Sequence, residues 1–301
     1  MEQSIRQMLQ SQMEHIRANL RVKPSLRSEQ DEVTVCPKCG GDGFILSRID
    51  ECGNEFYKPC DCRALRLMEN KLQGAAIPKE FCGYTVESFD LDLYKSADAR
   101  EKAELAKLLC RNYVKDFLNI RESGKGLYMY SHVKGSGKTR MAVSIANDII
   151  TRYRISAKFA TTIQLLDEIK KTWDKPEGGS EQNLLQEIID VPVLVLDDIG
   201  VEKMSPWVNE KFYSILNGRM IQKQITIFTS NCVIEQLAFD ERIINRIQKM
   251  ALPVPFPEES VRSVLASAEN KNFYNSLLRR GMRNNLIFHR LIFKRKEQLR
   301  C

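Results

Sequence analysis

The sequence lacks any run of about 18 consecutive apolar residues, the length that a helix needs to cross a bilayer. Its N-terminus also lacks the apolar centre and the small-residue cleavage site of a secretory signal peptide. We therefore expect no membrane segment and no export signal. The N-terminal stretch instead predicts an amphipathic helix that packs on this protein or on a partner through Ile5, Leu9, Met13, Ile16 and Leu20.

Acidic residues are nearly absent from the end of the chain, where residues 279–301 contain eight lysines and arginines and one acid, Glu297. Subtracting these from the 46 basic and 39 acidic residues leaves 38 of each in the rest of the chain. The net charge of +7 therefore lies in residues 279–301, together with any attraction that this charge exerts on a polyanion. Phe288 and Phe293 lie among these basic residues, so the segment could form a helix with an apolar face and basic edges. Such a helix either docks on this protein or contacts DNA phosphates through its basic residues.

The cysteines do not form the even, spaced set of a disulfide framework. There are nine of them in a long chain, and five lie between residues 36 and 62. This pattern favours a reducing, cytoplasmic compartment and a metal site.

Four of the clustered cysteines form two close pairs, Cys36 with Cys39 and Cys60 with Cys62. Four thiolates in two pairs suit tetrahedral Zn²⁺, and the GGDG stretch after the first pair lets the chain turn at the metal. Because every ligand comes from the protein, the zinc would be structural rather than catalytic. Cys52 is an alternative ligand, and a cluster of reduced, buried thiols is the other interpretation.

Between residues 121 and 266, apolar stretches alternate with amphipathic ones. Strands are predicted at 126–130, 157–161, 191–200 and 225–231, and helices at 139–153, 162–173, 183–190 and 205–222. Nearly continuous apolar strands between helices indicate an α/β fold, with a parallel sheet covered by helices on both faces.

A phosphate-binding pattern follows the first of these strands. The stretch from His132 to Thr139 matches G-x-x-x-x-G-K-[ST] at every fixed position except the first, where His132 replaces glycine. A loop of this kind aims backbone N–H groups at phosphate oxygens, so side chains must be small inside it. Histidine is tolerable at the strand exit because it enters left-handed backbone space more often than most residues. The predicted ligands of the phosphates and Mg²⁺ are Gly135, Ser136, Gly137, Lys138 and Thr139.

Polar residues end the next two strands of the predicted sheet. Asp197 and Asp198 end the stretch VLVLDD, where the first carboxylate would hold Mg²⁺ through water and the second would orient the attacking water. Asn231 ends the following strand and would sense the γ-phosphate. The alternative is that the two aspartates are a polar strand end. Together with the glycine-rich loop, these residues predict binding of ATP with Mg²⁺.

The motifs, in this order over residues 75–265, resemble the AAA+ helicase loaders of the DnaC/DnaI type in the IstB-like ATP-binding family. The stretches that carry the resemblance include IPKEFCGYTVESFD, GSGKTRMAVSIAN, LVLDDIG, DERIINRI and ESVR. The resemblance implies that Arg246 completes the ATP site of a neighbouring subunit and that Arg262 reads the γ-phosphate from the same chain. Loaders of the DnaI kind also carry an N-terminal zinc domain, which the related IstB transposition helpers generally lack.

The resemblance implies a protein that loads a replicative DNA helicase onto single-stranded DNA. Its ATPase activity would be slow and stimulated by DNA or partner, and the chains would form a homo-oligomer with ATP and DNA. The implied domains are a helicase-binding helix and zinc domain (1–70), a linker and leading helix (71–120), the ATPase (121–266) and the basic tail (267–301). Two alternatives stay open: an IstB-like ATPase that assists a transposase, and an adaptor that binds ATP with little turnover.

Overall fold

A computed structural model of the chain describes residues 36–172, 180–267, 269–271, 273–275 and 277. The predicted N-terminal helix and most of the basic tail lie outside the described residues. Two compact units divide the chain, one ending at Arg63 and one beginning at Ala64. The boundary predicted at residue 70 falls inside helix α2 (Asp61–Gly74). Within the described part, none of the helices combines the length and the hydropathy that crossing a membrane requires.

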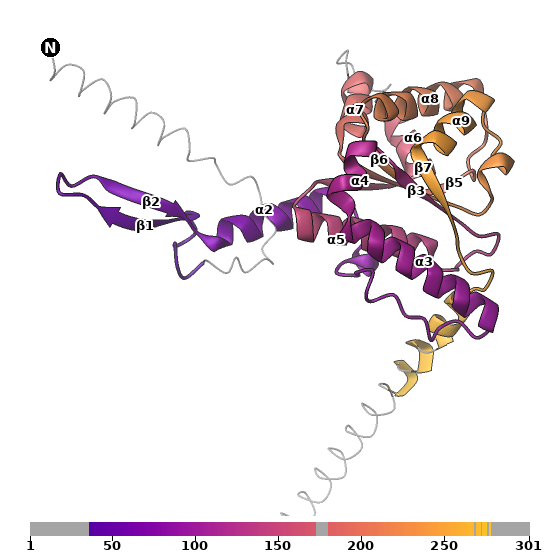
Figure 1. The fold of residues 1–301 in the computed structure, drawn as a ribbon, viewed down its shortest axis with the longest axis horizontal. Helices are drawn as coiled ribbons and strands as arrows, with labels where there is room; N and C mark the ends of the chain where they lie inside the picture. The colour runs from indigo at the N-terminus through magenta and orange to yellow at the C-terminus, as the bar shows by residue number, and fades with distance from the viewer. Residues whose placement is uncertain (1–35, 173–179, 268, 272, 276, 278–301) are drawn as a thin grey trace, which may run out of the picture. The chain divides into compact units, whose positions relative to one another are not determined.

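The first unit contains an antiparallel hairpin of β1 (Phe44–Ile49) and β2 (Glu55–Pro59), visible in Figure 1. The carboxylate of Asp50 closes its turn by accepting the backbone N–H groups of Cys52 and Asn54 at 3.0 and 2.8 Å. Because Phe44 is paired with Pro59, the hairpin brings the chain before β1 next to the chain after β2. The hairpin, which the sequence did not predict, therefore joins the two cysteine pairs.

The second unit is built on a five-stranded sheet in the order β4-β5-β6-β3-β7, and every neighbouring pair is parallel. The strands are β3 (Gly126–Tyr130), β4 (Ala157–Thr161), β5 (Val193–Ile199), β6 (Ile225–Ser230) and β7 (Ala251–Pro255). The predicted parallel sheet is confirmed. β7 was missed because Pro253 and Pro255 are unusual in strands, and it is tolerated because it lies at the edge of the sheet.

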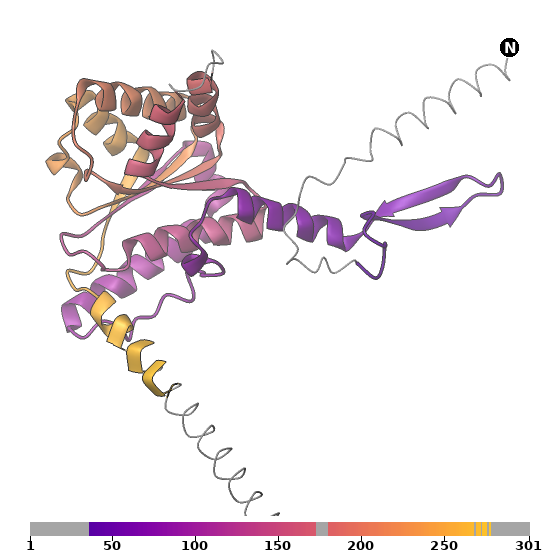
Figure 2. The ribbon, with the colours of Figure 1, turned by 180° about the vertical axis from the view of Figure 1, so that it is seen from behind.

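Helices cover both faces of the sheet, as predicted (Figures 1 and 2). Alternate strand residues face opposite cores. Leu127 and Met129 pack with α3 (Ala97–Lys115), α4 (Phe117–Ser123) and α5 (Lys138–Tyr153). Tyr128 packs with α6 (Thr162–Lys171), α8 (Pro206–Ile221) and α9 (Glu241–Met250). Because successive side chains of a strand point to opposite faces of the sheet, neighbouring residues in the sequence belong to two different apolar layers. Other described helical elements after α2 are η1 (Lys79–Phe81), α7 (Ser180–Asp190) and η2 (Ile234–Gln236).

The leading helix differs from its prediction. The sequence predicts one helix over residues 96–120, but the structure has α3 and α4 with a break at Asp116. The hydroxyl of Tyr153 lies 2.7 Å from the carbonyl oxygen of Val114 and 3.0 Å from that of Lys115. A partner on a distant helix thus satisfies carbonyls at the break. Periodicity within the segment itself cannot reveal such a partner.

Candidate functional site

The glycine-rich loop lies between β3 and α5. Gly135 and Gly137 have φ angles of +82° and +96°, in the left-handed region that favours glycine. A Cβ atom at Gly135 would also lie 2.8 Å from Ser260 Oγ and from Arg262 Cγ. The backbone conformation therefore requires glycine at both inner positions. The short distance from Gly135 to Arg262 shows that the predicted Arg262 lies directly over the loop.

His132 occupies the rim of this loop with an ordinary backbone. The described non-glycine residues with positive φ are Ala76, Arg154, Asp198 and Lys223, and His132 is not among them. The expectation that left-handed backbone space admits the histidine was therefore wrong. The chain leaves β3 without a left-handed residue at this position, so the backbone there does not require glycine.

Lys138 begins α5 and is buried at the centre of the loop. Its ammonium donates to the carbonyl oxygens of Ser131 and Val133, at 3.3 and 3.1 Å, and to Ser136 Oγ at 3.2 Å. Burial is the largest influence on the pKa of Lys138 and lowers it, while the nearby Asp198 and Glu258 act in the opposite direction. A partly desolvated cation at the start of a helix is a strong attractor for phosphate.

The two aspartates lie in a β-bulge, where the register between β5 and β6 shifts after Leu196. Asp198 has a φ of +56°, a strained conformation of the kind found at functional sites. Thr229 joins the pair, because its hydroxyl donates to Asp197 Oδ1 at 2.6 Å and accepts the N–H of Asp198 at 2.9 Å. Sequence reasoning missed Thr229, although its place two residues before Asn231 was a usable signal.

Asp197 is buried, and burial is the main cause that raises its pKa, although hydrogen bonds with Thr229 and Thr139 oppose the rise. Desolvation disfavours the charged form of a carboxyl group, and a nearby cation would favour it again. The contact with Thr139 brings together the two side chains predicted to hold Mg²⁺. Their carboxylate and hydroxyl oxygens are suitable ligands for that ion.

A cavity of about 510 Å³ opens over the loop and collects most of the predicted site residues. Among its lining residues are Gly135, Ser136, Gly137, Lys138, Thr139, Asp198, Asn231 and Arg262. They come from the loop, from the ends of β5 and β6 and from the segment after β7. Because parallel strands end at one edge of the sheet, residues far apart in sequence meet there.

One wall of the cavity is aromatic and was not predicted from the sequence. It includes Phe81, Tyr84 and Phe89, from the connector that precedes α3. The guanidinium of Arg140, on α5, lies 4.6 Å from the ring centroid of Tyr84 and donates to the carbonyl of Ser88. These rings give the cavity a flat apolar side next to its phosphate-binding side.

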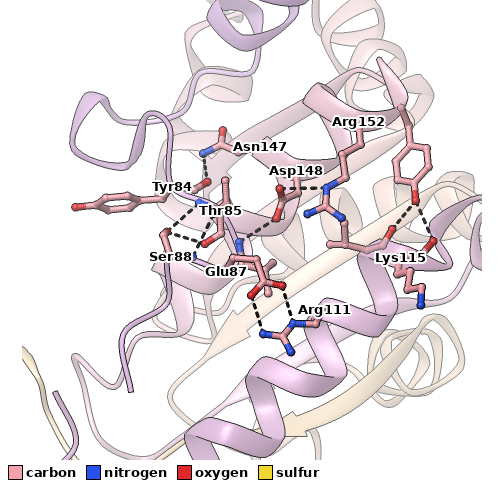
Figure 3. A network of polar contacts seen from close by, with 12 residues as sticks. Tyr84, Thr85, Glu87, Ser88, Arg111, Lys115, Asn147, Asp148 and Arg152 are labelled. Carbon is pink, nitrogen blue, oxygen red and sulfur yellow. Dashed lines mark hydrogen bonds and ion pairs between the residues drawn. The ribbon is translucent and has the colours of Figure 1, made fainter. Parts of the chain in front are cut away.

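Helix α5 holds this aromatic wall in place through a polar network (Figure 3). The side-chain amide of Asn147 donates to the carbonyl oxygens of Phe81 and Tyr84 at 3.0 and 2.9 Å. The carboxylate of Asp148 accepts the N–H of Val86 at 2.9 Å. The helix that begins at the phosphate loop thus also fixes the aromatic wall of the cavity.

Arg246 lies apart from the other predicted residues, on α9, and is not among those that line the cavity. Its guanidinium lies 4.1 Å from the ring centroid of Tyr213, and it donates to the Tyr213 hydroxyl at 2.8 Å and to Asn217 Oδ1 at 3.0 Å. Two residues of α8 therefore hold this side chain in a fixed orientation outside its own cavity.

The four predicted cysteines form a second candidate site. The sulfur atoms of Cys36, Cys39, Cys60 and Cys62 all lie within 4.8 Å of one another. Four sulfurs around a tetrahedral zinc ion are separated by about 3.8 Å, so this donor set fits the metal. Burial raises the pKa of Cys39, but hydrogen bonds, chiefly from Gly43 and Cys62, outweigh it and lower the pKa to about 6. Cys52 is exposed in the hairpin turn and is not part of the group.

The family model described as IstB-like ATP binding protein matches residues 57–262. This chain belongs to the family of IstB-like ATP-binding proteins. The match runs from β2 to Arg262 and includes the phosphate loop, the β5 aspartates and both predicted arginines. Cys36, Cys39 and the basic tail lie outside it. The resemblance inferred from the motifs is confirmed.

Curated relatives of this IstB-like protein include replication proteins. The replicative helicase loader DnaI of Bacillus subtilis (strain 168) is 29% identical over 226 residues, which are 69% of this chain and 68% of DnaI. The replicative helicase loader DnaC of Escherichia coli (strain K12) is 28% identical over 162 residues, which are 53% of this chain and 64% of DnaC.

A solved structure, the crystal structure of the DnaC helicase loader, superimposes on the IstB-like chain with a TM-score of 0.51 and 25% identity. It covers 60% of this chain and 99% of the DnaC chain. The AAA+ architecture expected from the sequence is therefore confirmed.

Proposed function

We propose that this protein binds ATP with Mg²⁺ and uses its hydrolysis to load a replicative DNA helicase onto single-stranded DNA. The observation that carries the ATP part is the meeting of Lys138, Asp198 and Arg262, from three distant segments, around one cavity. The names of the relatives in Bacillus subtilis and Escherichia coli support the helicase-loading part.

In this proposal each wall of the cavity has one task. The N–H groups of residues 135–139 and the ammonium of Lys138 bind phosphate oxygens, and the aromatic wall with Tyr84 contacts the base. Thr139 and Asp197 hold Mg²⁺, which offsets negative charge on the phosphates. Asp198 orients the attacking water by accepting its hydrogen bond.

Two further residues would report on the γ-phosphate. Asn231 at the end of β6 and Arg262 above the loop both line the cavity, and their N–H groups are donors suited to a terminal phosphate. Loss of that phosphate would remove their common partner. The site could thereby distinguish ATP from ADP.

Arg246 would act on a neighbouring subunit. Arg246 lies on α9, is held by Tyr213 and Asn217 of α8, and is not among the residues that line its own cavity, which supports a role in trans. Arginines supplied to a nucleotide site stabilise the charge that develops in phosphoryl transfer. Hydrolysis would then be slow in single chains and faster in a homo-oligomer assembled with DNA and helicase.

The cysteine cluster would hold a structural zinc ion through Cys36, Cys39, Cys60 and Cys62. With four protein ligands the ion has no open position for chemistry, so it cross-links the segments before and after the hairpin. The N-terminal unit formed in this way is the proposed contact with the helicase.

An IstB-like ATPase that assists a transposase, the alternative that the sequence resemblance left open, is also compatible with the family match. A pull-down with purified hexameric replicative helicase, with and without ATP, separates the two functions. A loader retains the helicase in an ATP-dependent manner, and Lys138→Ala weakens that dependence. Failure to retain any candidate helicase, with the ATP site active, would favour the transposase helper. Tight ATP binding with little hydrolysis under every condition would favour an adaptor.

A further inference from the structure

A short segment after β7 runs along the phosphate loop, and we name residues 256–262 the loop strap. The N–H of Phe256 donates to the carbonyl of Tyr130 at 2.8 Å, and the N–H of Val261 donates to the carbonyl of Gly135 at 3.0 Å. Between these points Ser131 Oγ donates to the carbonyl of Pro257 at 2.9 Å. The strap therefore contacts the loop at its start and at its inner glycine.

Glu258 is the part of the strap that binds the rim of the loop. Its Oε1 accepts the backbone N–H of His132 and its Oε2 accepts that of Val133, both at 3.1 Å. These amides follow the end of β3, so no neighbouring strand is paired with them. One carboxylate thus binds the two successive N–H groups at the entry to the loop.

The same stretch of backbone is bound from its other side by Lys138. Its ammonium donates to the carbonyls of Ser131 and Val133. The peptide group between Ser131 and His132 therefore has its carbonyl on Lys138 and its N–H on Glu258. Any change in the tilt of this peptide moves a hydrogen-bond partner of the ammonium.

We propose that Glu258 is a positioning residue for nucleotide binding, which holds the loop entry so that Lys138 and the phosphate-binding amides keep their orientation. The proposal deepens the proposed function and depends on ATP binding at this cavity. Fixing a flexible backbone costs conformational entropy, so a loop rim that is already fixed loses less entropy when it binds phosphate. The strap also ends at Arg262, so Glu258 and the arginine proposed to read the γ-phosphate lie on one short segment.

The neighbouring carboxylate provides a matched control. Glu259 lies in the same strap, but its Oε1 accepts the N–H of Lys95 at 2.9 Å and its Oε2 accepts the N–H of Ser96 at 3.1 Å, before α3. Glu259→Ala removes the same charge from the same segment and leaves the bonds to the loop rim. It therefore controls for net charge and for local loss of stability.

The test is a titration of the full-length chain with a fluorescent ATP analogue and Mg²⁺. Because Glu258 is exposed, we expect Glu258→Ala to weaken binding by about three- to tenfold rather than more. Glu259→Ala should change it by less than about twofold. Glu258→Gln keeps one acceptor oxygen but carries no charge, so a partial rescue of binding would assign the effect to the hydrogen bonds.

Hydrogen–deuterium exchange supplies a second measurement that needs no nucleotide. Amides of residues 131–134 should exchange faster in Glu258→Ala than in wild type or Glu259→Ala, with the rest of the chain unchanged. Equal losses of affinity in the two alanine variants, or unchanged exchange at the rim, would overturn the proposal. Wild-type protein that binds no nucleotide would contradict the proposed function, while the exchange data would still decide whether Glu258 holds the rim.

Discussion

The cysteine cluster and the nucleotide cavity obtain their geometry in different ways. The four cysteines all come from residues 36–62, and within residues 36–63 only Gly43 and Cys60 are buried. The cavity collects residues from Glu80 to Glu269 and rests on a sheet with an apolar core on each face. Because so few of these described residues are buried, we propose that residues 36–63 depend on a bound metal for their stability, whereas the cavity depends on the fold around it.

The largest expected effect comes from breaking the metal site. Cys36→Ser combined with Cys39→Ser should abolish zinc binding and unfold the hairpin, because structural zinc contributes an apparent free energy on the order of 10 kcal/mol in small domains. Metal analysis should give one zinc per wild-type chain and none in the variant. Cys52→Ser is the matched control and should keep its zinc. Wild-type protein free of metal, with the hairpin intact, would contradict the prediction.

The next effect concerns the arginine outside the cavity. Arg246→Ala should lower the hydrolysis rate of the assembled protein by about 10³-fold, the lower range for an arginine supplied to a phosphoryl-transfer site. Mixing it with Lys138→Ala should restore part of the activity at shared interfaces. Arg242→Ala, on the same helix, is the control. If mixing restores nothing while both variants are folded and oligomeric, Arg246 does not act in trans.

A smaller effect is expected for the buried lysine of the loop. Lys138→Ala should weaken ATP binding by about 1.5–3 kcal/mol, the typical contribution of a hydrogen bond to a charged group. Calorimetric titration measures the change directly. Lys125→Ala removes an equal charge immediately before β3, at the opposite end of that strand from the loop, and should bind like wild type. Equal affinity in Lys138→Ala and wild type would mean that the cavity does not bind phosphate as proposed.

The smallest and least local effect is that of the basic tail. Deleting residues 283–301 should weaken binding to single-stranded DNA and flatten its dependence on salt, by about 0.7 in slope for each phosphate that the shortened protein no longer neutralises. Binding measured at several salt concentrations checks this. An unchanged affinity and slope would assign the tail to a structural or partner-binding role.

The sequence predicted the parts of the fold that depend on local patterns. Four of the five sheet strands follow from apolar runs, the inner glycines follow from the fixed spacing of the loop pattern, and Asp198 follows from its place at the end of an apolar strand. The missed features depend on distant partners. Thr229 donates a hydrogen bond to Asp197 in the bulge, and the carboxylate of Glu258 accepts the backbone N–H of His132.

Two other elements illustrate the same limit. The break at Asp116 coincides with a hydroxyl from Tyr153, and the hairpin between the cysteine pairs contains few buried residues to mark it. Phe81, Tyr84 and Phe89 of the aromatic wall were noted only within the stretch IPKEFCGYTVESFD, which carries the family resemblance. The sequence does not show that Tyr84 lines the same cavity as the phosphate loop. Local patterns therefore identified the phosphate-binding side of the cavity and left its other sides undetermined.

The prolines of β7 have a consequence for how copies of this domain can meet. The N–H of Phe256 points to β3, so along the strand the alternate positions 253 and 255 face away from the sheet. Both are proline and offer no N–H, which leaves an incoming strand without donors there. At the opposite edge, the N–H of Phe159 on β4 is already bound to the carbonyl of Ala75. Continuing the sheet from one copy to the next is therefore disfavoured at both edges, and we expect any oligomer of these domains to be joined through other surfaces.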